Sequence, residues 1–147
     1  MDQQTSLTEL NHFIDLDEAR KLISTFQELK YQLVNPKFDR LQKEFGVLPT
    51  SEAFNQKSIL SLLAQDDCVG IRIHYGVKLK EENGEQVPLL VAVLVGVRSD
   101  GTNIWSNNIA APEQTQRTLM MNSPGRDAVI LEDSQRCPPY GDSDPIP

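Results

Sequence analysis

The chain has 147 residues, with 14 Lys and Arg against 21 Asp and Glu, and a formal net charge of −7. This length fits one domain that buries a core of its own, without help from a disulfide or a metal. The acidic balance, with no basic stripe along the chain, argues against nucleic acid and anionic membranes as partners, because both are bound mainly through Lys and Arg.

The sequence also predicts where the protein works. The first fifteen residues lack the basic start and apolar run of a secretory signal. The longest apolar stretch, Leu89 to Val95, is far shorter than the roughly 20 residues of a membrane helix. The two cysteines, Cys68 and Cys137, make a poor disulfide framework. We therefore expect a soluble, cytoplasmic protein with both thiols reduced.

The clearest helix prediction covers residues 16–34. Asp15 is a good N-cap with Glu18 three residues later, and Asn35-Pro36 ends the helix because the residue before proline avoids the α region. Between these limits, apolar side chains recur at the spacing of one helix face: Leu16, Ala19, Leu22, Ile23, Phe26, Leu29 and Leu33.

Shorter helices are expected over 7–13, over 39–45 and after Asn55. The first begins with the Ser-x-x-Glu pattern of a capping box, and the second stops at Gly46. The third has apolar residues on either side of its cap, at the spacing of a hydrophobic staple.

A β-hairpin is predicted next. Residues 68–80 alternate strictly between two faces, Asn83-Gly84 is a strong signal for a tight turn, and the return strand 87–98 is apolar on both faces and should be central. One face of the first strand carries Val69, Ile71, Ile73, Tyr75, Val77 and Leu79, and the other carries Cys68, Gly70, Arg72, His74, Gly76, Lys78 and Lys80.

The hairpin register stays open. A two-residue turn sets Arg72 beside Val95, and a three-residue loop sets it beside Gly96. Further strands are expected from Ile104-Trp105 and from 128–132. The predicted fold class is α+β, with N-terminal helices packed on an antiparallel β-meander of three to four strands. We expect a single domain over 1–136 and an extended surface tail over 137–147.

Several of these segments resemble a family of small uncharacterised bacterial proteins. The resemblance rests on Phe54 to Ser58, Leu62-Leu63, Cys68 to Ile73 and Cys137-Pro138-Pro139-Tyr140. Its members share a helix leading into a Cys-x-Gly-Ile-Arg-like strand, and many end in Cys-Pro-Pro-x-Cys. The resemblance implies no known activity. Gly141 stands where the second tail cysteine would be, so a paired-thiol role does not carry over.

The residues that carry chemistry form no strong catalytic pattern. On one strand Cys68 and His74 lie about 20 Å apart, at roughly 3.3 Å per residue, whereas a nucleophile and its base need about 3 Å. Cys68 therefore reads as a small buried hydrophobe. The Cys and His residues lack the paired spacing of a metal site, and the glycines are scattered, so we expect no metal and no cofactor.

Two weaker binding sites remain. Arg72 and His74 share a face with two glycines, which suggests a shallow anion-binding groove; alternatively, this face is solvated and its glycines admit a neighbouring helix. The polar segment after residue 101 carries large apolar residues, which either meet a protein partner or fold back onto the core: Trp105, Ile109, Met120 and Met121.

These observations favour a non-enzymatic binding or accessory module over an enzyme. Its expected binding surfaces are the segment 102–127 and the edge of the sheet. The alternative is a small ligand-binding protein or enzyme with its site at Arg72 and His74. The sequence does not define the oligomeric state.

Overall fold

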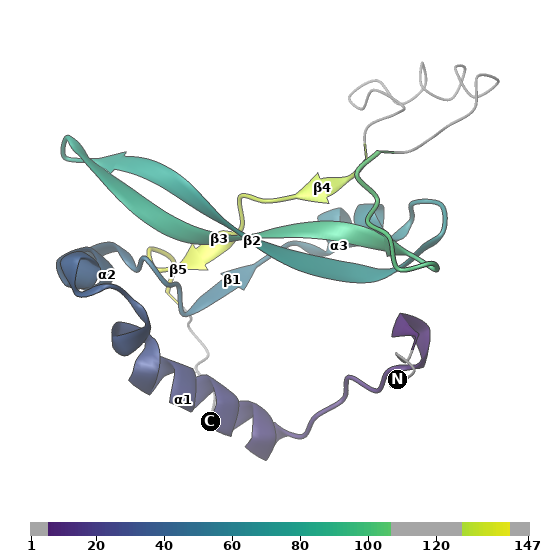
Figure 1. The fold of residues 1–147 in the computed structure, drawn as a ribbon, viewed down its shortest axis with the longest axis horizontal. Helices are drawn as coiled ribbons and strands as arrows, with labels where there is room; N and C mark the ends of the chain where they lie inside the picture. The colour runs from purple at the N-terminus through teal and green to yellow at the C-terminus, as the bar shows by residue number, and fades with distance from the viewer. Residues whose placement is uncertain (1–5, 107–127, 142–147) are drawn as a thin grey trace. The chain divides into compact units, whose positions relative to one another are not determined.

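The structure, a computed structural model, describes residues 6–106 and 128–141 (Figure 1). Among the described residues, every helix and one short strand precede residue 68 and the other strands follow it, so the predicted α+β class is confirmed. The chain groups into two compact units, each built from three segments. The first unit contains Met1–Leu10, Asn55–His74 and Val93–Glu132, and the second contains Asn11–Phe54, Tyr75–Ala92 and Asp133–Pro147.

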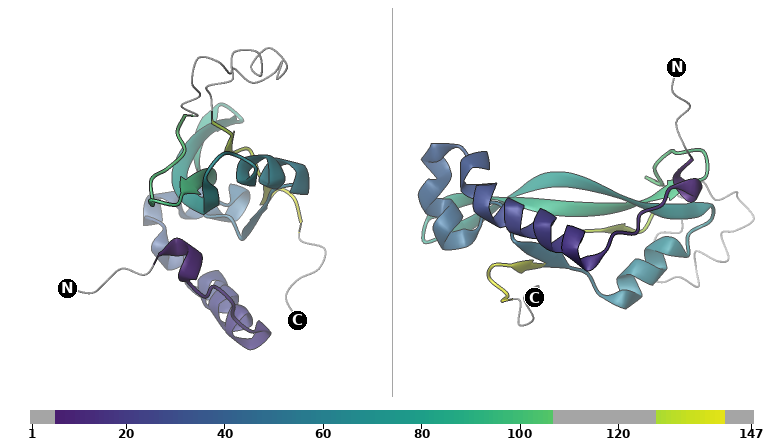
Figure 2. Two further views of the ribbon diagram at one scale, coloured as in Figure 1. Left: turned by 90° about the vertical axis from the view of Figure 1, so that its right-hand side faces the viewer. Right: turned by 90° about the horizontal axis from the view of Figure 1, so that it is seen from below.

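The second unit begins with the long helix. Helix α1 spans Leu16–Leu33, and the Asp15 side chain caps it by accepting a 2.8 Å hydrogen bond from the Glu18 backbone N–H. The prediction for 16–34 is thus confirmed to within one residue. Figure 2 shows α1 as one uninterrupted helix. None of its residues is buried, so its apolar face makes no core among the described residues.

A 3-10 turn, η2 (Pro36–Phe38), leads into α2 (Asp39–Phe45), which matches the predicted helix 39–45. Gly46 follows in the left-handed conformation, with φ of 68°. The apolar face of α2 packs against β3, and the two elements together form a small core. The core contains Leu41, Val87 and Leu89, with Phe38, Phe45 and Val47 partly buried around it.

Gly46→Ala is expected to lower the free energy of unfolding by about 2–4 kcal/mol. A left-handed backbone costs a non-glycine residue roughly 1–2 kcal/mol, and the new Cβ would lie 2.6 Å from Pro138 Cδ. Gly84→Ala is the matched control, because Gly84 also has positive φ but no atom lies within 4 Å of its Cβ position. Urea unfolding measures both losses. Equal losses would mean that the Pro138 contact contributes nothing.

The first unit contains η1 (Leu7–Glu9) and α3 (Gln56–Leu63). The predicted helix 7–13 is wrong in length: it is a single 3-10 turn. The reason is local, because the Ser6 hydroxyl bonds the Thr8 hydroxyl and makes no cap bond to the backbone. Helix α3 starts as predicted, with the Asn55 side chain accepting from the Ser58 N–H, and its Leu62 is fully buried.

The predicted hairpin is confirmed as strands β2 (Cys68–Glu82) and β3 (Glu85–Arg98). Asn83 and Gly84 both have positive φ, 53° and 79°, as a type I′ turn requires. The turn has two residues, the length for which Arg72 is expected beside Val95; that pairing stays a prediction. The sheet order is β2-β3-β4, so β3 is central as expected (Figure 1).

The remaining strands differ from expectation. The segment predicted from 128 to 132 forms only the short β4 (Ile130–Leu131), antiparallel to β3. The strand predicted to start at Ile104-Trp105 is wrong, because neither residue belongs to a strand. In the part of this segment that the structure describes, Asn103 makes an isolated antiparallel bridge with Val97. The Arg98 guanidinium binds the backbone oxygens of Asn103 and Ser106, which folds this segment back onto its own turn.

A second, two-stranded sheet lies in the second unit. It joins β1 (Ser51–Ala53) to β5 (Gln135–Cys137) in antiparallel register, with Glu52 opposite Arg136. The sequence did not indicate this pairing. Cys137, the first residue of the expected tail, is therefore the last residue of strand β5. Arg136, one residue before it on the same strand, is buried in the interior of the unit.

Candidate functional site

The predicted pair Arg72 and His74 contacts the segment that follows β3. The Arg72 guanidinium donates to the Gly101 carbonyl at 3.2 Å and to the Asn103 side-chain oxygen. The His74 ring lies 5.2 Å from the Trp105 ring, at an angle of 45°. Its buried Nε2 has no hydrogen-bond partner among the described residues. Both side chains thus hold this segment against the strand.

Gly70, one of the two glycines on this face, admits a neighbouring side chain. A Cβ at Gly70 would lie 2.8 Å from Leu7 Cδ2, so η1 occupies the space that Gly70 leaves open. At Gly96 the nearest atom is Cys68 Sγ, at 2.9 Å. The half-buried Cys68 thiol donates to the Gly70 carbonyl, as fits a structural residue. At Gly70 this packing agrees with the interpretation in which a glycine makes room for a neighbouring element.

The proposed interaction segment is described only at its start. Trp105 is 54% exposed, and its ring lies beside that of His74. Ile109, Met120 and Met121 lie outside the described residues, so their role stays a prediction. Of the four residues in this hypothesis, Trp105 is the one that the structure describes, and it lies at the surface.

The apolar face of β2 is exposed. In the second unit, Tyr75 is 71%, Val77 64% and Leu79 63% exposed, although all three lie on the apolar side of the alternating strand. In the part of the sheet that the structure describes, β2 is also an edge strand. The alternation was visible in the sequence, but the sequence could not tell which face the rest of the chain would cover.

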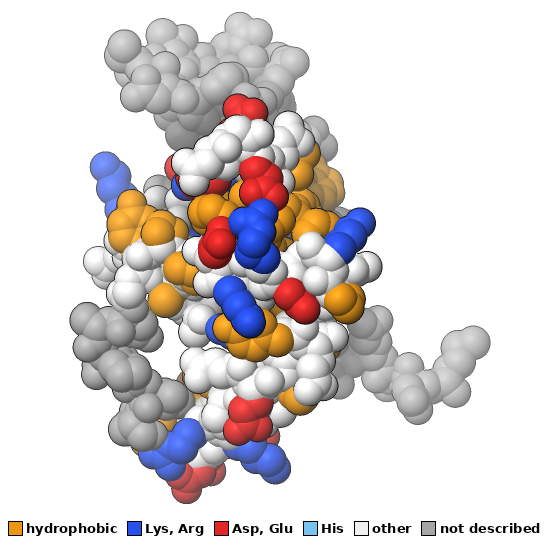
Figure 3. All heavy atoms as spheres, turned by 90° about the vertical axis from the view of Figure 1, so that its left-hand side faces the viewer, with side chains coloured by type: hydrophobic (Ala, Val, Ile, Leu, Met, Phe, Trp, Pro, Cys, Tyr) orange, Lys and Arg blue, Asp and Glu red, His pale blue; other side chains and the backbone are white. Residues whose placement is uncertain are grey.

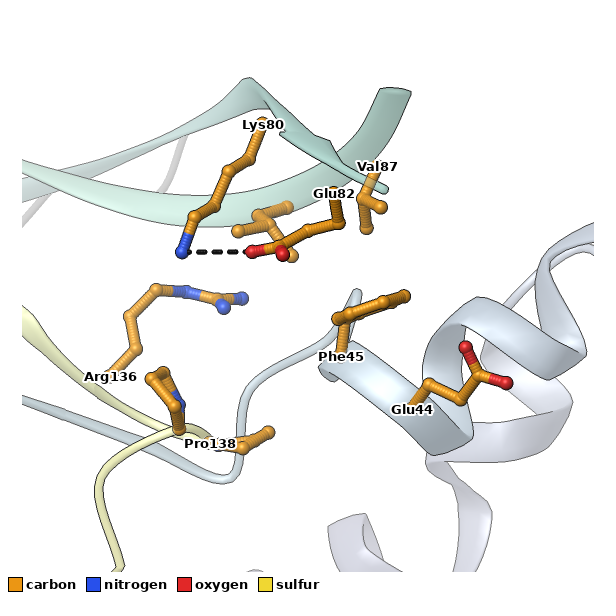
Figure 4. A pocket seen from close by; sticks show the side chains of 9 residues that line it. Glu44, Phe45, Lys80, Glu82, Val87, Arg136 and Pro138 are labelled. Carbon is orange, nitrogen blue, oxygen red and sulfur yellow. Dashed lines mark ion pairs between the residues drawn. The ribbon is translucent and has the colours of Figure 1, made fainter. Parts of the chain in front are cut away.

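The opposite face of the hairpin borders a pocket of about 130 Å³ in the second unit (Figure 4). Apolar walls come from α2, β3 and the segment after β5: Phe45, Val87, Leu89, Pro138 and Pro139. Four charged side chains also line the pocket: Glu44, Lys80, Glu82 and Arg136. We call this cavity the Arg136 pocket. It combines a mostly apolar interior with a few charged groups, as small-molecule sites do.

Arg136 is the buried cation of this pocket, with 8% of its surface exposed. Its Nη2 donates to the Gly46 and Leu90 carbonyls, both at 2.9 Å, and more weakly to the Val47 carbonyl. Its Nε also donates to the Leu90 carbonyl, at 3.2 Å. The guanidinium thus joins β5 to β3 and to the turn after α2.

The third guanidinium nitrogen is different. Nη1 of Arg136 is buried and has no hydrogen-bond partner among the described residues. Leaving a buried charged donor unpaired costs more than about 1–3 kcal/mol. Figure 4 shows the guanidinium projecting between Phe45 and the ion pair of Lys80 with Glu82. The unpaired donor therefore belongs to a group that reaches into the cavity.

The electrostatics of Arg136 reflect this burial. Desolvation lowers the pKa of Arg136, and the negative charge of Glu52 acts in the opposite direction. The Glu52 carboxylate is itself engaged, since one oxygen accepts from the Ala92 N–H at 3.2 Å and from the Ser134 hydroxyl at 2.7 Å. Glu52 therefore lowers the cost of the buried charge without binding the guanidinium directly.

The carboxylates that line the pocket have other partners. Glu82 pairs with Lys80 at 3.2 Å, and Glu44 pairs with Arg40 at 2.9 Å. Figure 3, which views the side of Figure 1 where α2 lies, shows Lys and Arg side chains next to Asp, Glu and hydrophobic ones. Arg136 is thus the lining cation without a carboxylate bound to it in the described part of the chain.

Nothing in the sequence singled out Arg136, because its partners are backbone carbonyls far away along the chain.

Over residues 6–106 and 128–141, no three His, Cys, Asp or Glu side chains gather closely enough to hold a metal ion. No described helix is both long and apolar enough to span a membrane. The chain matches no protein-family model, and comparisons with curated proteins and with solved structures find no similar protein.

Proposed function

We propose that this chain is a non-enzymatic binding module whose binding surface is the apolar face and open edge of β2. The observation that carries the proposal is the row of exposed side chains at Tyr75, Val77 and Leu79. Binding is favoured over catalysis because Cys68 donates its thiol hydrogen to a backbone carbonyl. We keep the cytoplasm as the proposed compartment, which agrees with the two free cysteines.

An edge strand offers unpaired N–H and C=O groups to any other strand. Proteins that avoid such pairing place charges, prolines or bulges on the edge. Here Lys78 and Lys80 belong to the opposite face, and Lys80 lines the Arg136 pocket. On the exposed face the first charged residue after the apolar row is Glu81. The row is therefore left open to a partner strand.

The occupant that fits this edge is the β2 strand of a second copy. A two-fold antiparallel pairing centred on Val77 sets Tyr75 opposite Leu79, so all three apolar side chains meet apolar side chains. It also sets Lys78 opposite Gly76. A pairing centred on Lys78 would instead bring two lysines face to face, which is unfavourable. Charge and apolar matching thus select the same register.

Val77→Lys is expected to weaken self-association by about a hundredfold or more. The change removes one buried apolar side chain from each copy, worth roughly 1.5–3 kcal/mol each, and sets two like charges opposite each other. Sedimentation velocity over a wide concentration range measures the dimer fraction. Ile130→Lys is the matched control, because Ile130 is 43% exposed on the other edge strand of the same sheet.

Two results would overturn the proposal. One is a wild-type chain that stays monomeric at every concentration. The other is a dimer that both substitutions weaken equally, which would mean that association does not depend on β2. Dimerisation that is lost in Val77→Lys and kept in Ile130→Lys supports it.

A further inference from the structure

We propose that the Arg136 pocket binds a small monocarboxylate with a compact apolar body. This site is separate from self-association along β2. The carboxylate would accept from the unpaired Nη1 of Arg136, and the apolar body would lie against the walls formed by Phe45 and the two prolines. The reasons are the hydrogen bonding of the cation, the charge of the lining and the size of the cavity.

The hydrogen bonding points to an anion. Arg136 is more than nine-tenths buried, and its Nη1 has no partner among the described residues. The other guanidinium nitrogens are held by the Leu90 and Gly46 carbonyls, which fix the orientation of the group. A guanidinium fixed in this way is well suited to a carboxylate, because its planar donors match the carboxylate oxygens.

The charge of the lining limits the ligand to one negative charge. Glu82 is paired with Lys80 and Glu44 with Arg40, so each lining carboxylate already has a cation. Arg136 is left as the lining cation with no carboxylate bound to it among the described residues; Glu52 acts on its charge only from a distance. A monoanion neutralises it, whereas a phosphate ester or a dicarboxylate would bring a second negative charge close to Glu44 and Glu82.

The size and lining of the cavity limit the rest of the ligand. A dry cavity of about 150 Å³ holds a benzene molecule, and this pocket has a volume of about 130 Å³. Its walls include one aromatic ring, two aliphatic side chains and two proline rings: Phe45, Val87, Leu89, Pro138 and Pro139. The cavity is therefore of the size that takes one flat ring or a short branched chain as the apolar body of the ligand.

Benzoate is the probe, and benzamide is its uncharged isostere. Titrations of the isotope-labelled full chain at low salt, followed by amide chemical shifts, measure both affinities. We expect saturable shifts with benzoate for residues that line the pocket, and binding of benzamide that is at least tenfold weaker. Equal affinities for the two probes, or no saturation with benzoate, would overturn the proposal.

Three substitutions separate the ligand contact from a structural role. Arg136→Lys keeps a positive charge but removes the fork of donors, and we expect benzoate binding to be lost. Lys80→Gln should weaken benzoate by roughly fivefold or less, as for a partly exposed ion pair. Glu82→Gln should strengthen it, because a negative charge leaves the lining and Lys80 loses its partner.

The variants of Lys80 and Glu82 keep the test decisive if Arg136→Lys does not fold. Lys78→Gln is the control, because Lys78 lies on the same strand but does not line the pocket. Opposite effects at Lys80 and Glu82, with no change at Lys78, support the site. If Lys78→Gln weakened benzoate as much as Lys80→Gln did, benzoate would respond only to the overall charge, and the proposal would be wrong.

Discussion

Arg136→Met is expected to lower the free energy of unfolding by about 3–5 kcal/mol. The substitution keeps much of the apolar stem but removes donors from the Gly46 and Leu90 carbonyls. Each buried acceptor left unpaired costs about 1–3 kcal/mol. The link from β5 to β3 and to the turn after α2 is lost at the same time. Urea unfolding followed by circular dichroism gives the change.

Arg40→Met is the matched control for this result. Arg40 pairs with Glu44 and Glu85 on the surface, and its own side chain is 57% exposed. Exposed ion pairs contribute little to stability, because water and salt screen them, so this variant should lose little stability. If Arg136→Met lost no more than Arg40→Met, Arg136 would not be a structural link, and its bonds to the carbonyls would have little net value.

Leu62→Ala is expected to cost about 2–5 kcal/mol, the range for a truncated core leucine. Leu62 on α3 is fully buried, so the removed methyl groups leave a cavity in the first unit. Leu60→Ala is the control on the same helix, because Leu60 is 55% exposed. We expect it to change stability by less than about 1 kcal/mol.

Thermal and urea unfolding of the two leucine variants measure the difference. If only Leu62→Ala greatly lowers the free energy of unfolding, the buried Leu62 side chain is what holds α3 in the first unit. Similar small losses for both would show that α3 is not held by its buried face, contrary to the burial of Leu62.

The candidate sites were only partly predictable from the sequence. We expected the edge of the sheet to be a binding surface. The proposed self-association uses that edge together with the exposed apolar side chains of β2. The sequence offered Trp105 as an interaction residue; it is half exposed, and its role stays a prediction. Arg136 was missed, because an arginine between Gln135 and Cys137 has no pattern of its own. Its significance comes from carbonyls at positions 46 and 90.

The sequence by itself determined where the main helices and the hairpin turn begin and end, because these signals act over a few residues. Asp15 and Asn55 start their helices through side chains that accept backbone N–H groups three residues later. Gly46 ends α2 in a conformation that only glycine adopts easily, and Asn83-Gly84 turns the hairpin. Each of these was predicted and then confirmed.

The tertiary structure alone decided which surfaces are covered. Alternation divides β2 into two faces, but the side that α2 and β5 occupy depends on contacts between residues far apart in the sequence. For this reason Tyr75, Val77 and Leu79 are exposed while the lysine face borders a pocket. The pairing of β1 with β5 is of the same kind. Strands of three residues carry too short a pattern to be recognised, and they form only where the rest of the fold brings them together.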